Sequence, residues 1–385
     1  MAHWGSSRLL ALLSFLLSAC ASVQAPAMRD ASVTAAPPPV TATPEAVSTT
    51  ASVMAPVVEE PDCPDARGPL DGALVFGAGN SLNMIRPDGG DLRLLLDLPG
   101  TSWAHEPAWS PDGSMLAYML SQPATGGDIP GLQTSVICGL ERTTGAGRLL
   151  LRGSTSTEAL EEPAWTPDGQ SLVVTRRQTS ADPETGMIAS TVALVRYNLA
   201  SGMPQVLVEG ASSPAISPDG ERLAYIRYDQ QTEDVVLVLA RADGMEGRLI
   251  AETQPPFGVF VAPRWSPDGA VLLFAASRGA AAAGASPIGW HAVVDTLLGA
   301  EVAHAHGDPA ALWIVDRDGQ NLRALTEPDL DDPRAAWAPD GASIAVVAGS
   351  GSGVSLLDVT TGEVRQLTTE GDYGGISWAP TTQAP

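Results

Sequence analysis

The chain has 385 residues, a formal net charge of −23 and 44% hydrophobic residues, which is enough for a substantial core. Its 21 basic residues are all arginine, so the sequence excludes chemistry that needs a lysine, such as a Schiff base or a P-loop. The acidic balance argues against binding nucleic acid or an anionic membrane through the folded part, because phosphates attract basic surfaces.

The first twenty residues are typical of an export signal. Arg8 precedes an apolar run over 9–17 that is too short to span a bilayer permanently, and "LSAC" follows, ending at Cys20. This ending resembles the bacterial lipobox, in which the cysteine is lipidated and becomes the new N-terminus. We therefore expect residues 1–19 to be a signal peptide. Cys20 would anchor the exported protein to the outer membrane, or to the outer leaflet of the cell membrane.

Residues 20–62 are rich in Ala, Pro and Thr and show neither helical nor strand periodicity. Such a composition predicts an extended tether between the lipidated N-terminus and a folded domain over 63–385. If Cys20 carries lipid, Cys63 and Cys138 remain as an even pair in an oxidising compartment. Either a disulfide or two buried free thiols would account for them.

From about residue 69 the chain consists of short β-type runs separated by turns, and one pattern recurs. "PAWSPDGSMLAY" begins at Pro107, and related stretches begin at residues 163, 214, 263 and 334, with a shortened "GISWAP" at 375–380. Each copy is followed by two further strand-like runs. Units of roughly 40 to 50 residues with four strands each are typical of propeller blades.

The two ends of the repeat region complement each other. The first unit, at 73–97, contains second, third and fourth strands but no first strand, whereas the chain ends on a first strand with no second. We predict an all-β, six-bladed β-propeller in which the C-terminal inner strand completes the first blade. This closure would leave no open sheet edge.

The repeated "W-S/T/A-P-D-G" turn, together with "IVDRDGQNLRALT" at 314–326, resembles the repeat of TolB-type six-bladed β-propellers. The resemblance covers about 310 residues and implies the fold more strongly than a function. It implies either a periplasmic scaffold protein or the propeller part of a peptidase. The chain departs from the TolB protein itself, because the tether stands where that protein has a separate N-terminal α/β domain.

Two recurring residues have structural explanations. The five repeat tryptophans are expected to lie between adjacent blades, because each blade must bury the same face: Trp109, Trp165, Trp265, Trp337 and Trp378. The aspartate of each "PDG" is expected to cap its turn by bonding to the backbone two residues on, while the glycine supplies a left-handed backbone.

The loops that enter the inner strands are expected to share one mouth of the channel, opposite the PDG turns. They carry carboxylates and aromatics that could form a partner-binding rim: Trp103, His105, Glu106, Glu161, Glu162, Phe257, Phe260, Asp329, Asp331, Asp332, Asp372 and Tyr373. A solvated acidic surface is the other interpretation. Glu106, Glu162 and Asp332 each precede a proline that opens an inner strand, so they could also ring the channel and hold a cation.

The interval between the copies that begin at 263 and 334 is longer than the others, and it predicts an insertion in blade five over 277–309. Its apolar residues recur at helical spacing, which favours a short amphipathic helix. His304, His306 and Asp308 follow it. They form either a flexible polar loop or part of a zinc site that lacks an identified further ligand.

The sequence contains no G-x-S-x-G elbow, no Gly-rich phosphate loop before a helix and no H-E-x-x-H motif. Peptidases with such propellers need a separate α/β-hydrolase domain, for which we expect no room after residue 380. We therefore expect a monomeric, non-enzymatic module that binds or scaffolds an envelope protein or peptide. We expect it to have no cofactor. The alternative is a metal-assisted hydrolase or lyase with its site at the channel mouth.

Overall fold

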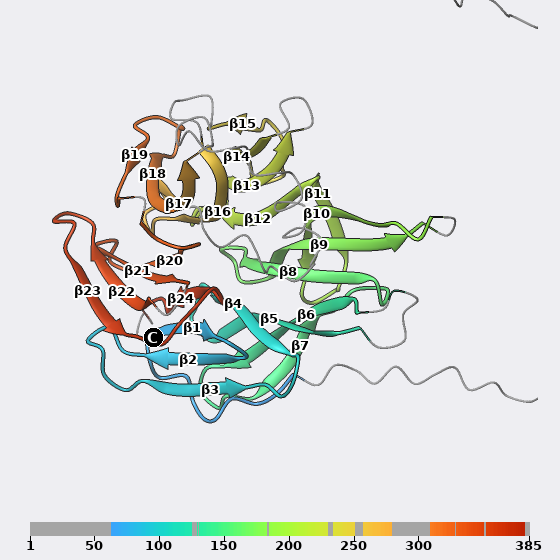
Figure 1. Ribbon diagram of the computed structural model, residues 1–385, viewed down its shortest axis with the longest axis horizontal. Coiled ribbons are helices and arrows are strands. Elements are labelled where there is room, and N and C mark those ends of the chain that lie inside the picture. The colour runs from blue at the N-terminus through green and yellow to red at the C-terminus, as the bar shows by residue number, and fades with distance from the viewer. Residues whose placement is uncertain are drawn as a thin grey trace, which may run out of the picture. The chain divides into compact units, whose positions relative to one another are not determined.

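The alternation of short apolar runs with glycine-containing turns produces an all-β fold. The computed structural model describes residues 63–124, 129, 131–182, 185–229, 234–250, 257–278, 309–327, 329–349 and 352–381. These residues contain six four-stranded antiparallel sheets arranged around a centre as the blades of a propeller (Figure 1). The predicted signal peptide, Cys20 and the tether over 20–62 lie outside the described residues.

In each blade the four strands follow one another from the centre of the propeller outward. Blade one contains β24 (Ile376–Trp378), β1 (Leu74–Ala78), β2 (Ser81–Ile85) and β3 (Arg93–Asp97). Blade two contains β4 (Trp103–Trp109), β5 (Met115–Pro123), β6 (Gln133–Glu141) and β7 (Gly147–Leu151). Blade three contains β8 (Glu158–Trp165), β9 (Ser171–Ala181), β10 (Ile188–Asn198) and β11 (Pro204–Glu209).

The other three blades follow the same order. Blade four contains β12 (Ala211–Ile216), β13 (Arg222–Asp229), β14 (Asp234–Arg241) and β15 (Arg248–Leu249). Blade five contains β16 (Phe257–Trp265), β17 (Val271–Arg278), β18 (Ala310–Asp316) and β19 (Arg323–Ala324). Blade six contains β20 (Arg334–Trp337), β21 (Ser343–Ala348), β22 (Gly353–Asp358) and β23 (Val364–Thr368).

Blade one contains segments from both ends of the folded part. The C-terminal strand β24 is hydrogen-bonded antiparallel to β1, and Val75 pairs with Ser377 at the centre of the register. In Figure 1 the red end of the chain accordingly lies beside the blue first strand.

The hydrophobic core is divided into six clusters, one between each pair of neighbouring blades. The cluster between blades six and one includes Phe76 and Ile376, which are 0% and 2% exposed, so this interface is packed like the other five. Each fully buried side chain of this size contributes about 1.5–3 kcal/mol through removal of apolar surface from water.

The repeat tryptophans join neighbouring blades, as the sequence predicts. The indole Nε1 of Trp165 donates to the carbonyl of Ala108 in the preceding blade at 3.0 Å, and Trp265 donates to Ala215 at 3.1 Å. Because these two indoles pack between blades while bonding to the backbone of the preceding inner strand, blade packing explains the tryptophan at this position.

The PDG turns also follow the prediction. In blade three, Asp168 accepts hydrogen bonds from the backbone N–H of Gln170 at 3.0 Å and from the Thr166 hydroxyl at 2.6 Å. Gly169 has a φ of +67°, the left-handed conformation that favours glycine. In blade four the equivalent bonds from Ser217 and from the backbone of Glu221 lower the pKa of Asp219 to about 2.

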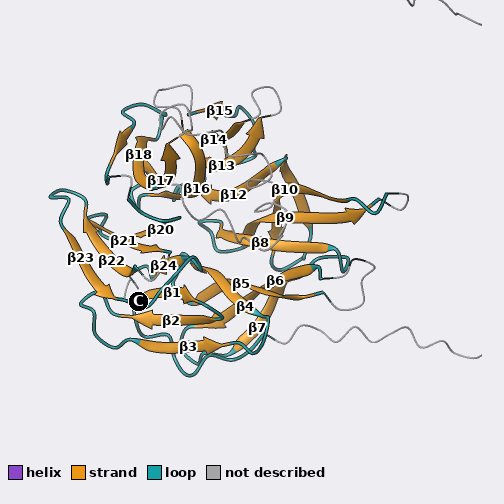
Figure 2. Cartoon of the chain, viewed as in Figure 1, coloured by secondary structure: helices purple, strands orange, loops and turns teal. Residues whose placement is uncertain are grey.

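The described residues contain no helix (Figure 2). The amphipathic helix expected within 277–309, and with it His304, His306 and Asp308, falls almost entirely in 279–308, outside the described residues. Within the part of the chain that the structure describes, no helix is long and apolar enough to cross a membrane.

Candidate functional site at the channel mouth

Each blade has two ends, and the chain direction distinguishes them. The inner strand β4 begins at Trp103 and runs to Trp109, directly before the PDG turn of its blade. The inner strands of the other blades have the same direction. We call the end where the inner strands begin the mouth face, and the end that carries the PDG turns the turn face.

A β-bulge interrupts the inner strand at the same place in four blades. The register with the second strand shifts after His105, Glu161, Ser212 and Val261 in blades two to five. The cause is local. In each strand a proline stands two residues after the residue named above, and proline has no N–H to donate to the strand ladder.

The bulged residue in each of these strands has a left-handed backbone. The φ angles of Glu106, Glu162, Ser213 and Ala262 lie between 47° and 53°. In blade one the equivalent position is Gly375, whose φ is 83°. Such bulges turn one side chain out of the alternation of the strand, and three of these positions carry polar residues, Glu106, Glu162 and Ser213.

Glu106 connects blades that are not neighbours. Its carboxylate accepts a hydrogen bond from Arg334 Nε of blade six at 3.3 Å, and its second oxygen lies 3.5 Å from Arg264 Nη2 of blade five. On the other side, the Glu106 backbone N–H donates to the carbonyl of Gly374, in the segment before β24, at 2.8 Å. A Cβ on Gly375 would lie 3.1 Å from a Glu106 carboxylate oxygen, so a side chain there would crowd this residue.

Arg334 has carboxylates on two sides. Its Nη1 donates to Asp332 at 2.6 Å, in addition to the bond from its Nε to Glu106. Burial alone would lower the pKa of Arg334, but Asp332 and Glu106 outweigh burial and raise it, so the guanidinium remains charged. Arg334 therefore places a positive charge of the chain itself between Glu106 and Asp332.

Glu162 lies in a separate polar contact. Its carboxylate accepts three hydrogen bonds, from the Ser213 backbone N–H at 2.7 Å, the Ser213 hydroxyl at 2.6 Å and the Thr175 hydroxyl at 2.6 Å. Burial and then the charge of Glu106 raise the pKa of Glu162 above its usual value, despite these bonds. Burial also disfavours the charged form of His105, and it therefore lowers the pKa of this imidazole.

In the structure, the carboxylates of Glu106, Glu162 and Asp332 are already engaged with other side chains of the protein. Glu106 and Asp332 are paired with Arg334, and Glu162 is bonded to Ser213. Among the described residues there is no group of three His, Cys, Asp or Glu side chains that could hold a metal ion.

The remaining predicted rim residues lie at the mouth face, and many are engaged in internal contacts. Tyr373 donates its hydroxyl to Asp331 at 2.7 Å, Asp372 accepts the backbone N–H of Gly79 at 2.6 Å, and Glu161 forms an ion pair with Arg177. The rings of Trp103 and His105 lie 6.5 Å apart. Asp329 is exposed and precedes the inner strand of blade six. Phe257 and Phe260 belong to β16, and their side chains are outside the description.

Sequence reasoning missed Arg264, Arg334, Ser213 and Thr175. A signal for Arg264 exists: the residue before the repeat aromatic or its replacement is alanine in blades two, three and four, and arginine in blade five. Thr175 lies on a second strand and reaches Glu162 from there, so a search restricted to the loops overlooks it.

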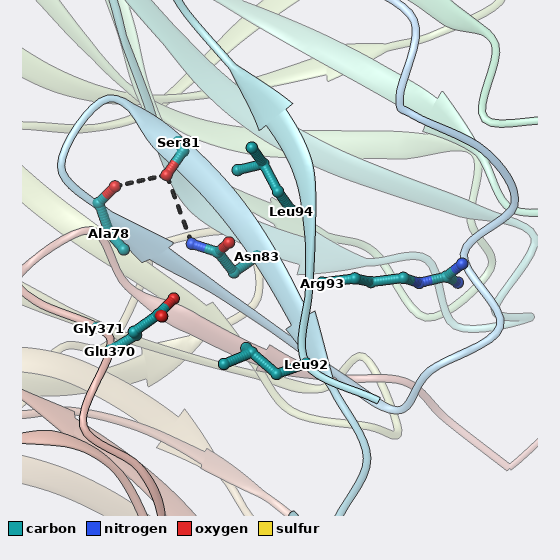
Figure 3. A pocket seen from close by; sticks show the side chains of 8 residues that line it. All are labelled: Ala78, Ser81, Asn83, Leu92, Arg93, Leu94, Glu370 and Gly371. Carbon is teal, nitrogen blue, oxygen red and sulfur yellow. Dashed lines mark hydrogen bonds between the residues drawn. The ribbon is translucent and has the colours of Figure 1, made fainter. Parts of the chain in front are cut away.

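A hollow of about 510 Å³ lies elsewhere, against blade one (Figure 3). It is lined by Ala78, Ser81, Asn83, Leu92, Arg93, Leu94, Glu370 and Gly371. Ser81 donates to the Ala78 carbonyl and accepts a bond from Asn83, so polar groups of this hollow bond to one another. None of the charged channel residues lines it.

The two cysteines of the folded part form a disulfide, the first of the two alternatives that the sequence leaves open. Cys63 and Cys138 have Cα atoms 5.7 Å apart, and both residues are buried. The bond attaches the first described residue of the chain to β6 of blade two.

No protein-family model matches the chain. A curated relative, described as "Uncharacterized peptidase YuxL" of Bacillus subtilis (strain 168), is 26% identical over 157 residues, which are 39% of this chain and 19% of the relative. The chain thus matches about a fifth of that protein's length. The expectation that the chain is not an enzyme is therefore corrected, because a relative with detectable sequence similarity is described as a peptidase.

A solved structure supports the fold. TolB from Acinetobacter baumannii superposes with a TM-score of 0.54 at 15% identity, over 82% of this chain and 68% of that protein. An oligogalacturonate lyase in complex with manganese has a TM-score of 0.48 at 14% identity, over 77% of this chain and 73% of that one. At these identities the likeness concerns the fold alone: the chain is a six-bladed β-propeller with a TolB-like fold.

Proposed function

We propose that this propeller is a recognition module of the bacterial cell envelope that binds a peptide or protein segment at its mouth face. The observation that carries the proposal is the charged group at the channel, in which Glu106, Arg264, Arg334 and Asp332 come from three different blades. Arg264 and Asp332 keep 31% and 32% of their side-chain surface exposed, so a ligand at the mouth can reach both signs of charge.

The surroundings suit recognition of a polypeptide. Ligand-binding residues concentrate on loops held by a rigid scaffold, and the mouth face carries the entry loops of the blades. Trp103 is half-buried beside His105 and offers an aromatic surface close to the charges. The description of the curated relative as a peptidase also favours peptide as the ligand class.

Export and lipid anchoring at Cys20 are part of the same proposal. The first described residues, 63–70, would follow the tether, and they are bonded to the turn face. Leu70 donates its N–H to the Arg142 carbonyl at 2.8 Å, and Ala66 donates its N–H to the Gly145 carbonyl at 2.7 Å. Both acceptors belong to the β6–β7 turn.

We further propose that β24 holds the ring closed. The support is its pairing with β1 and the packed cluster between blades six and one. Closure matters for the site, because Glu106 bonds to Gly374 on one side and to arginines of blades five and six on the other.

Photo-crosslinking in native cells tests the binding face. A photoreactive phenylalanine analogue at Trp103 should give a crosslinked product of defined mass, whereas the same analogue at Asp243, exposed in the β14–β15 turn on the turn face, should not. Equal products from both positions, or a product from position 243 alone, would contradict the proposed binding face.

A further inference from the structure

Arg264 is a large, charged residue at a repeat position where other blades have a small residue. The equivalent residues in blades two, three and four are Ala108, Ala164 and Ala215, and in blade one Ser377. Because a small residue fits this position in the other blades, the arginine is not required by blade packing. Its guanidinium instead reaches across to Glu106 of blade two.

The guanidinium of Arg264 is only partly used within the protein. Its Nη1 donates to the carbonyl of the adjacent Pro263 at 2.9 Å, and its Nη2 lies at the long distance of 3.5 Å from Glu106. A guanidinium has five N–H donors. Arg334 provides the contrast, since it has a short bond to a carboxylate of its own blade and a second bond to Glu106.

Among the residues that the structure describes, the carboxylate beside Arg264 is Glu106 of blade two, and none comes from blade five. At the bulge, where blades two and three have Glu106 and Glu162, blade five has Ala262, whose side chain carries no charge. Arg264 therefore shares Glu106 with Arg334. Burial raises the pKa of Glu162, which reduces the negative charge that would repel an anion from this part of the channel.

We propose that Arg264 binds a carboxylate of the ligand at the channel mouth. The matching chemistry is a bidentate pair between the planar guanidinium and a carboxylate, the geometry in which arginine binds such groups most strongly. In a polypeptide ligand the carboxylate comes from the C-terminus or from an Asp or Glu side chain. This inference rests on the proposed function, because it names the chemical group that the mouth face recognises.

The test uses the purified full chain and three hexapeptide libraries, analysed by affinity selection with mass spectrometry. One library has free C-terminal carboxylates, the second is C-terminally amidated, and the third is amidated and lacks Asp and Glu. Each is presented to the unmodified chain, to Arg264→Ala and to Arg317→Ala. The last removes the same charge at the turn face, where Arg317 is paired with Asp219 and Glu221.

The unmodified chain and Arg317→Ala should lose at least tenfold in affinity when the carboxylate is removed, whereas Arg264→Ala should bind all libraries with the same weak affinity. A loss on amidation assigns the C-terminus, and a loss only with the third library assigns a side chain. Retention of the carboxylate preference in Arg264→Ala would overturn the inference while leaving the proposed function intact. If no library binds any form of the chain, the proposed function itself fails. Equal melting temperatures of the variants would show that the fold is unchanged.

Discussion

Glu162 shows how the fold changes the chemistry of a single side chain. On a solvated loop this carboxylate would be ionised at neutral pH, but the bulge of β8 directs it toward Ser213 and Thr175 within the protein. Burial penalises the ionised form more than the three hydrogen bonds favour it, so the pKa is raised. The sequence indicates that an acidic residue stands here, but not that its environment favours the neutral acid.

The raised pKa of Glu162 predicts a pH-dependent contribution to stability. The contribution is complete below the pKa of a glutamate in the unfolded chain, and it is lost as the pH rises through the folded pKa, because the folded state then has to ionise a buried group. The unfolding free energy of the unmodified protein, relative to Glu162→Gln, should therefore fall between acidic and neutral pH. Each unit of pKa shift corresponds to about 1.4 kcal/mol.

Chemical denaturation of both proteins across this pH range measures the difference. A difference that stays constant, or that grows with pH, would show that Glu162 is not held in an environment that favours its protonated form.

The contacts of Arg264 and Arg334 could not be predicted from the sequence around each residue. The carboxylates were found because each precedes a proline that opens an inner strand. The arginines belong to other blades, and their partners are 158 and 228 residues away in sequence. The arrangement of the blades brings these charges together, so no local pattern in the sequence indicates that Arg334 lies beside Glu106 and Asp332.

At the scale of the elements, local chemistry made prediction effective. The PDG turns and the tryptophan contacts follow from Asp, Gly and Trp acting over a few residues, and the structure has them as predicted. The bulges were not predicted, although their cause is visible in the sequence as the proline inside each inner strand. They bear on the proposed function, because Glu106 and Glu162 are the bulged residues of their strands.

The segment from Cys63 to Leu70 is the element most dependent on a covalent bond. It has backbone hydrogen bonds to blades one and two but forms no strand among the described residues. The disulfide closes a sequence separation of 75 residues, for which loop-closure entropy predicts a stabilisation of about 4 kcal/mol.

Replacing both cysteines, in a Cys63→Ala/Cys138→Ala variant, should lower the unfolding free energy by about this amount in denaturant titrations. Peptide binding at the mouth face should be unchanged, because the bond lies between the segment and β6. An unchanged denaturation midpoint would contradict the proposed role of the bond in holding the start of the folded part.

At the scale of the whole molecule, the number of blades and their order of strands could be predicted from repeat spacing alone. The charged site could not, because it depends on how the ring is joined. Glu106 is bonded to the segment before β24 and to arginines of blades five and six, so the site exists only if the first and last blades meet.

Hydrogen exchange at the amides of β24 tests this dependence most directly. If β24 completes blade one, the amides of Ile376–Trp378 that bond to β1 should exchange as slowly as those of the inner strand β20, Arg334–Trp337, which is paired with β21 within its own blade. Exchange of the β24 amides at the rate of an unstructured chain, with β20 still protected, would contradict closure of the ring and the site that depends on it.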